Sequence, residues 1–176
     1  FPSIISSHVR KGLQLAQDDP KSLLVFSGGQ TRKDVGPISE AASYYYLADS
    51  QGWIPPQTAT TTGTGPSAED KDKDTQTYPV RDRVYLDEFA RDSFENLLFS
   101  LCRYREVTGN YPSKVSVVGF DFKEARFVDQ HRAALGFPAE RFSYVGLTPV
   151  KGSGFNHIVA EAGEEKIRAV FEKDPY

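Results

Sequence analysis

The stretch from Val115 to His131 constrains the fold of this chain most, because it predicts a strand that runs directly into a helix. Three of the four residues at 115–118 are valine, which is apolar and β-branched and favours a buried strand. Asp121 and Glu124 then follow with the spacing of a capping box, which predicts the start of a helix. Ligands of open α/β sheets bind beyond the carboxyl ends of the strands, so this turn is a candidate ligand site.

Two positive charges, Lys123 and Arg126, lie in the first turns of this predicted helix. Cations at a helix N-terminus oppose the helix dipole, so they do not serve the helix itself. An anionic ligand that binds the free backbone N–H groups would explain their presence. The alternative is that both are solvated charges on a surface helix, and this stretch alone does not decide between the two.

Helical and strand patterns alternate along the whole chain. The sequence predicts helices over residues 1–16, 38–50, 92–107, 121–135 and 158–171, and short strands over 23–26, 84–86, 115–118 and 142–145. Alternation of this kind predicts an α/β fold, in which parallel strands are joined by right-handed helical crossovers.

Composition narrows the class of protein. The net charge of −3 gives no general attraction to nucleic acid or to anionic membranes. No apolar run approaches the roughly 20 residues that span a bilayer, so we expect no membrane span. The single cysteine, Cys102, excludes an internal disulfide and a cysteine-only metal site. Its position within a predicted helix, beside the apolar stripe, predicts a small core residue.

One segment differs in kind from the rest. Residues 55–79 combine Thr, Gly and Ser with alternating charges and hold almost no large apolar residue, which predicts a flexible insertion within a single domain spanning 1–176. The chain also holds no methionine, even at position 1. We therefore expect a processed product or a fragment of a longer protein.

Polar residues and glycines collect where the predicted strands end and the helices begin. Because the carboxyl ends of parallel strands share one edge of a sheet, these residues are expected to converge. They are Ser27, Gly28, Gly29, Glu40, Glu88, Ser93, Asn96, Asp121, Lys123 and Arg126. Acids and bases in one cleft suit a small polar or phosphorylated ligand, or general acid/base catalysis. Each residue also has an ordinary structural explanation, such as a helix cap or a surface amide.

The residue types suggest roles for the cleft. Arg126 and Lys123 would hold an anion, and the Gly28–Gly29 backbone would approach it closely. Glu88 is the candidate general base, and Asn96 would orient the ligand. Glu88 and Arg126 are therefore the predicted catalytic residues. A hard cation held by Glu40, Glu88 and Asp121 is a further hypothesis, although no zinc, P-loop or dinucleotide motif is present.

Several motifs together resemble the YdcF/SanA/ElyC-like family. They are SGG at 27–29, SEA at 39–41, Glu88 followed by DSFEN at 92–96, and VGFDFKEARF at 118–127. Residues 89–109 and 131–138 are similar to eukaryotic, particularly fungal, members, which implies an intracellular, cytoplasmic protein. The motif positions matched are Gly28, Gly29, Glu40, Glu88, Ser93, Glu95, Asn96 and Arg126.

The resemblance implies a three-layer Rossmann-like fold, with a mostly parallel sheet and helices on both faces. It implies a charged cleft at the strand ends and S-adenosylmethionine as a candidate cofactor. Asp121-Phe122 departs from the bacterial pattern, in which a histidine commonly precedes the helix, and makes Lys123 and His131 candidate substitutes. Family members also usually begin with one more strand, so the resemblance implies that the given sequence starts after that strand.

Two functional hypotheses follow. The first is a protein that binds a small anionic or nucleotide-like ligand and acts as a transferase or hydrolase. The second is a non-catalytic ligand sensor, or a scaffold that recruits partners through the insertion at 55–79.

Overall fold

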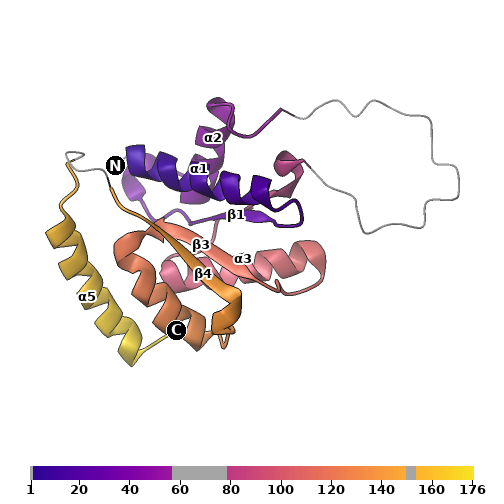
Figure 1. Cartoon of the computed structure of the whole chain (residues 1–176). Helices are drawn as coiled ribbons and strands as arrows, with labels where there is room; N and C mark the ends of the chain where they lie inside the picture. Colours follow the sequence, from indigo (N-terminus) through magenta and orange to yellow (C-terminus); the bar gives the residue numbers. More distant parts are fainter. Residues whose placement is uncertain (1, 57–78, 150–153) are drawn as a thin grey trace, which may run out of the picture.

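A computed structural model describes residues 2–56, 79–149 and 154–176 of the chain (Figure 1). Its helices and strands alternate as predicted, in the order α1 (Pro2–Asp18), β1 (Leu24–Ser27), α2 (Glu40–Ser50), β2 (Val84–Asp87), α3 (Ser93–Thr108), β3 (Val115–Phe120), α4 (Arg132–Ala134), β4 (Phe142–Leu147) and α5 (His157–Lys173). Short 3-10 helices occupy Lys33–Val35, Val80–Arg83, Asp121–Lys123 and Ala139–Arg141, and a π-helix occupies Arg126–His131.

The strands form two separate parallel pairs. In the first, Leu24 of β1 lies opposite Val84 of β2; in the second, Val115 of β3 lies opposite Phe142 of β4. Both pairs are parallel, which confirms the predicted α/β class. Within the described residues no strand pairing joins β1–β2 to β3–β4, so the single continuous sheet that we expected is not seen there.

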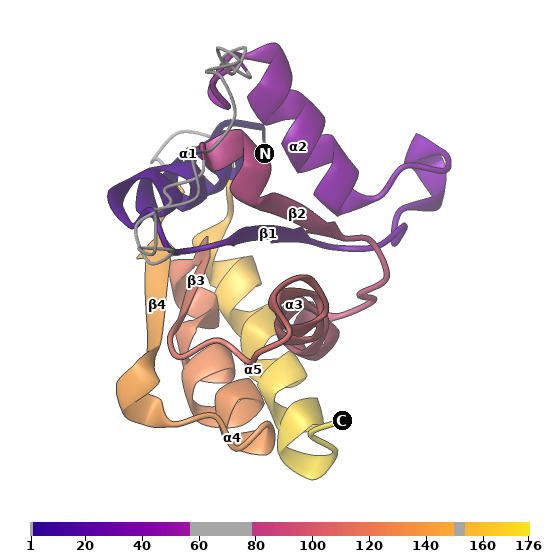
Figure 2. The ribbon, with the colours of Figure 1, turned by 90° about the vertical axis from the view of Figure 1, so that its right-hand side faces the viewer.

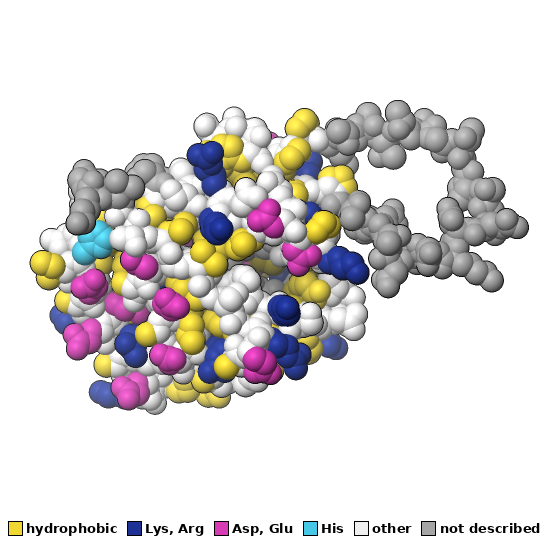
Figure 3. All heavy atoms as spheres, viewed as in Figure 1, with side chains coloured by type: hydrophobic (Ala, Val, Ile, Leu, Met, Phe, Trp, Pro, Cys, Tyr) yellow, Lys and Arg dark blue, Asp and Glu magenta, His cyan; other side chains and the backbone are white. Residues whose placement is uncertain are grey.

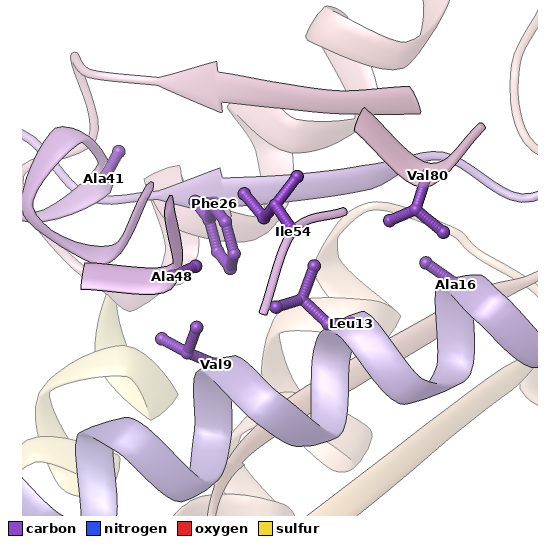
Figure 4. Close-up of a cluster of buried hydrophobic side chains, with 8 residues drawn as sticks. All are labelled: Val9, Leu13, Ala16, Phe26, Ala41, Ala48, Ile54 and Val80. Atoms are coloured by element: carbon purple, nitrogen blue, oxygen red, sulfur yellow. The ribbon is translucent and has the colours of Figure 1, made fainter. Parts of the chain in front are cut away.

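Helices cover both faces of the β1–β2 pair. Helices α1 and α2 lie on one face and α3 on the other (Figure 2). The core between α1, α2 and β1 is apolar, because the helical period brings Val9, Leu13 and Ala16 of α1 to one side, where they meet Phe26. Figure 4 shows this cluster, which consists of Val9, Leu13, Ala16, Phe26, Ala41, Ala48, Ile54 and Val80.

The β3–β4 pair is packed differently. None of its strand residues is fully buried. Three aromatic rings stack at the end of β3, where Phe120, Phe122 and Phe155 have ring centroids 5.2–5.8 Å apart.

Helix α5 corrects one expectation. The sequence predicts that its buried side consists of Ile167, Val170 and Phe171, but Ile167 is 43% exposed and Val170 is 63% exposed. The one buried residue of α5 is instead the acid Glu164. Other acidic side chains gather on the outer surface over α5 (Figure 3). The helix therefore turns a carboxylate inward and leaves much of its apolar surface in water.

Two further expectations concern single segments. Cys102 is exposed, which corrects the prediction of a core residue. The fully buried residues of α3 are Phe94 and Leu97, both in its first half. Most of the predicted insertion, 57–78, lies outside the described residues. No helix in the described part of the chain is long and apolar enough to cross a membrane.

Candidate functional site

A cavity of about 480 Å³, the strand-end cleft, lies beyond the carboxyl ends of β1, β2 and β3. Most of the sequence-predicted residues line it, namely Gly28, Glu40, Ser93, Asn96, Lys123 and Arg126. The other lining residues are Thr31, Ala90, Arg91, Asp92, Phe122 and, from α5, Val159, Ala160, Gly163, Glu164, Ile167 and Phe171. A larger hollow of about 720 Å³, between the π-helix and α5, contains none of the predicted residues.

The two glycines after β1 are explained by close packing. Gly28 has a φ of +147°, and a Cβ there would lie 2.8 Å from the Cβ of Glu40. A Cβ on Gly29 would lie 2.7 Å from the carbonyl oxygen of Ala90. The Glu40 N–H donates to the Gly29 carbonyl at 3.1 Å. The glycines therefore let α2 begin directly against β1, and only Gly28 lines the strand-end cleft.

Ser39 caps α2 and holds Glu88 by a hydrogen bond from the same hydroxyl group. The sequence predicts Ser39 as a helix cap, and its Oγ accepts a hydrogen bond from the Ala42 N–H at 2.9 Å, so Ser39 is the N-cap of α2. The same hydroxyl donates to Glu88 Oε1 at 2.7 Å. Glu88 is exposed and does not line the strand-end cleft, whereas Glu40 does. The predicted catalytic pair of Glu88 and Arg126 is therefore not brought together in this cavity.

A polar network lies at the ends of β1 and β2. Ser27 Oγ donates to Asp87 Oδ2 at 2.6 Å and lies 3.0 Å from Asn96 Oδ1. Asp87 is buried, and its other oxygen accepts from the Phe89 N–H. These hydrogen bonds join β1 and β2 to α3. Of Ser27, Asp87 and Asn96, only Asn96 lines the strand-end cleft.

The sequence shows capping-box spacing at Asp92 and Glu95 as well as at Asp121 and Glu124, and the two predictions have different outcomes. Asp92 Oδ1 accepts from the Glu95 N–H at 2.9 Å and caps α3, which confirms the prediction. Asp121 makes no such cap: its carboxylate accepts from the neighbouring Phe122 N–H and from the Thr148 hydroxyl. Asp121 is therefore tied to the end of β4 and does not line the cleft.

A buried ion pair crosses the strand-end cleft. Arg126 Nη2 lies 2.8 Å from Glu164 Oε2, with the two side chains only 5% and 6% exposed. Neither Arg126 Nε nor Glu164 Oε1 has a hydrogen-bond partner among the described residues. The pair thus joins the helix after β3 to α5 but leaves polar atoms on both partners unsatisfied.

Burial controls the electrostatics of this region. Desolvation lowers the pKa of Arg126, partly offset by the Glu164 charge, and it raises the pKa of Glu164 against the pull of Arg126. The pKa of Lys123 is also lowered, first by burial and then by Arg126 beside it. Two cations, Arg126 and Lys123, therefore share a poorly solvated space with the buried carboxylate of Glu164, and Glu40 lines the same cavity.

A serine and a histidine meet at the wall of the cleft. Ser93 Oγ lies 2.8 Å from His131 Nε2. His131 is 1% exposed, and its ring meets Phe94, Phe127 and Phe171 edge to face, with centroids 4.5–5.7 Å apart. Burial, and then the charge of Arg126, lower the pKa of His131 to about 4, so the ring is neutral at pH 7.

Sequence reasoning assigned no role to Glu164 in this site, and it named His131 only as a candidate substitute for the histidine of the bacterial pattern. Glu164 carries no local signal, because its burial depends on where α5 packs. His131 is five positions after Arg126, and in an α-helix, which advances about 100° per residue, such residues face different sides. The π-helix has i→i+5 hydrogen bonds, and it carries both residues to the cleft region.

Comparison with known proteins assigns no activity. No family model matches the chain, and no solved structure matches it. The chain is 31% identical over 155 residues to an uncharacterized protein of Saccharomyces cerevisiae, an alignment that covers 81% of this chain and 51% of the yeast protein. The chain therefore spans about half the length of the curated relative it matches.

Proposed function

We infer that this chain is a YdcF-like protein whose strand-end cleft binds a small anionic ligand of the phosphorylated or nucleotide-like class, such as S-adenosylmethionine or a phosphate ester, as a transferase or hydrolase. The observation that carries this inference is the burial of Arg126 and the half-burial of Lys123 in one cavity at the strand carboxyl ends. Buried cations need a partner, and the ion pair with Glu164 leaves Nε of the Arg126 guanidinium unpaired among the described residues.

The arrangement of helices supports a three-layer Rossmann-like fold. Both strand pairs are parallel, and the β1–β2 pair has α1 and α2 on one face and α3 on the other. In such folds the ligand binds where loops and helix N-termini meet at the strand ends. The strand-end cleft occupies that position, next to the N-termini of α2 and α3.

The lining suits the separate parts of a nucleotide-like ligand. Arg126 presents a planar fork that matches phosphate or carboxylate oxygens. Glu40 offers carboxylate oxygens to hydroxyl groups such as those of a ribose, and it already accepts from Thr31 and Tyr44 at 3.4 and 3.3 Å. Phe122 adds an aromatic surface on which a ring can stack.

Glu164 acts in this proposal as an internal substitute for the anion. Its single contact with Arg126 leaves Arg126 Nε and Glu164 Oε1 unsatisfied. A phosphate group carries more acceptor oxygens than the contact now uses, so it satisfies the guanidinium more fully. The ligand therefore displaces Glu164, and α5 shifts as the anion enters.

The first experiment is a thermal-shift and calorimetric screen with inorganic phosphate, a nucleoside monophosphate, a sugar phosphate and S-adenosylmethionine. A ligand at 100 times its Kd stabilises the fold by about 2.7 kcal/mol, which such a screen detects. We expect Glu164→Gln to tighten anion binding, because the competing charge is removed. The matched control is Glu165→Gln, an exposed neighbour on α5 whose loss should leave the affinity unchanged.

A double variant tests the anion site without leaving a buried charge. Replacing both partners of a buried ion pair by apolar residues often preserves stability, so Arg126→Met combined with Glu164→Leu is expected to fold. This variant should lose binding of every anionic ligand in the panel. Unchanged binding in the folded double variant would contradict the proposal, and no binding by any variant would favour the scaffold hypothesis.

A further inference from the structure

The pair formed by Ser93 and His131 is the most reactive arrangement in the described part of the molecule. Ser93 is the first residue of α3, and His131 is the last residue of the π-helix. The 2.8 Å separation of Ser93 Oγ and His131 Nε2 is a hydrogen-bond distance, and it is the contact that a nucleophile makes with its general base.

Ser93 has the surroundings of a nucleophile. It lines the strand-end cleft, so its hydroxyl is accessible to a ligand there. The 16-residue helix α3 begins at Ser93, and the positive end of its dipole stabilises negative charge that develops on Oγ. Arg126 lines the same cavity and would hold the anionic group of a substrate.

A purely structural role leaves a feature of His131 unexplained. When Ser93 donates to Nε2, the ring proton resides on Nδ1, and that nitrogen is buried with no partner in the described residues. The ring is surrounded by Phe94, Phe127 and Phe171, where an aromatic hydrocarbon would pack without leaving a polar atom unpaired. A buried, unsatisfied nitrogen of this kind is typical of a functional group.

Neighbouring charges couple the base to the ligand. Arg126 is close enough to disfavour protonation of His131, whereas Asp92 favours it to a smaller extent. An anion bound to Arg126 offsets the positive charge, so the imidazole accepts a proton more readily when the substrate is present. The π-helix provides this coupling, because it holds both residues in one segment, with Arg126 lining the cleft and His131 buried against Ser93 at the cleft wall.

We propose that Ser93 attacks the phosphorus of a phosphomonoester held by Arg126, with His131 as general base, so that the cleft hydrolyses its ligand through a phosphoseryl intermediate. This inference rests on the anion binding proposed above. The Oγ–P bond forms as the bond from phosphorus to the alcohol oxygen breaks. The Ser93 proton passes to His131 Nε2 and then to the leaving alcohol.

The second half of the reaction restores the enzyme. Water attacks the phosphoseryl phosphorus, and His131 accepts the water proton. The Oγ–P bond breaks, inorganic phosphate leaves, and the proton returns to Ser93 Oγ. One phosphomonoester and one water therefore give one alcohol and one phosphate, with no other reactant.

The test uses para-nitrophenyl phosphate with the full chain, followed by acid quenching and mass spectrometry of the peptide that contains Ser93. We expect release of nitrophenol and a phosphoryl group on Ser93. Ser93→Ala should abolish both signals. His131→Phe, which keeps the aromatic packing, should slow phosphorylation by about 10²–10⁴-fold, the usual contribution of a general base. Ser50→Ala, at the exposed end of α2, is the control and should behave as wild type.

Parallel calorimetry with inorganic phosphate separates this inference from the proposed function. Phosphate binding that is equal in wild type and Ser93→Ala would support the anion site. If no phosphoserine then forms, or if hydrolysis survives in Ser93→Ala, Ser93 is not the nucleophile and the proposal of anion binding still stands. If wild type binds no phosphate, both proposals fail. If His131→Phe does not fold, the Ser93→Ala result and the presence of phosphoserine decide the matter.

Discussion

Two buried arginines, one in each half of the molecule, show how differently the halves are built. Arg83, beside the β1–β2 pair, directs its guanidinium at the carbonyl oxygens of Ala16, Asp19 and Ser22, at 2.7–3.1 Å. These carbonyls belong to the end of α1 and the turn after it, where a cation is favourable. Arg126, beside β3–β4, has a single carboxylate partner and an unpaired Nε.

The contrast extends to the surroundings of each arginine. The β1–β2 half has an apolar core from four helical or loop segments and one strand, and its buried arginine binds the end of a helix. The β3–β4 half buries Arg126, His131 and Glu164 beside Phe127. We conclude that the first half supplies most of the stability, whereas the second half tolerates incompletely paired polar groups where a ligand is expected.

The largest expected effect is a loss of stability when the apolar core of the β1–β2 half is changed. Phe26→Ala removes a buried ring from the centre of the apolar cluster, and such substitutions cost about 3–5 kcal/mol. Denaturant unfolding followed by the fluorescence of Trp53, which packs against the same cluster, measures the change. Tyr46→Ala is the control, because Tyr46 is 61% exposed; an equal loss in both variants would contradict this division of stability.

Low pH should destabilise the β3–β4 half, in which His131 is buried. The pKa of His131 is about 4 in the folded protein against an ordinary value of 6.5, so only the unfolded chain binds this proton between those values. Stability is therefore fully present above pH 6.5 and falls as the pH approaches 4, by on the order of 3 kcal/mol at about 1.4 kcal/mol per pKa unit.

The variant His131→Phe separates the contribution of His131 from that of His8. The pKa of His8 is also lowered to about 4, mainly by burial, so His8 adds to the loss in the same window. His131→Phe should remove one part of the pH dependence and leave the part due to His8. Urea unfolding at pH 7 and pH 4.5 checks this, and an unchanged pH dependence in His131→Phe would show that His131 does not titrate as described.

A smaller effect is expected at the helix cap that borders the cleft. Asp92→Ala removes the side chain that accepts from the Glu95 N–H, and loss of an N-cap costs about 1 kcal/mol. Asp34→Ala, which breaks an exposed ion pair with Arg32, should give no measurable change in the same urea assay. Similar midpoints for Asp92→Ala and wild type would mean that α3 does not depend on this cap.

Local patterns predicted the elements and several of their ends. Asp92 and Ser39 cap helices where spacing placed them, because a cap depends on residues only three positions away. The alternation of helices and strands also predicted parallel pairing, and most of the proposed strand-end residues share one cavity.

Features that depend on distant packing were not predictable. Glu164 meets Arg126 only because α5 packs across the cleft, and Glu88 is held outside it by the cap residue of another helix. Cys102 lies beside an apolar stripe, yet its side chain is exposed on α3. The π-helix shifts the register in which His131 faces its neighbours, and no local rule indicated it.

The exposed position of Cys102 has a practical consequence. The chain contains one tryptophan and one cysteine. Trp53 lies with the α1–α2 core on one side of the β1–β2 pair, and the cysteine thiol lies on α3, on the other side. An acceptor dye attached to that thiol would make Trp53 and Cys102 a donor–acceptor pair for measuring distance across the β1–β2 pair. Energy transfer from the indole would then report any change in the separation of the two helical layers as a ligand enters.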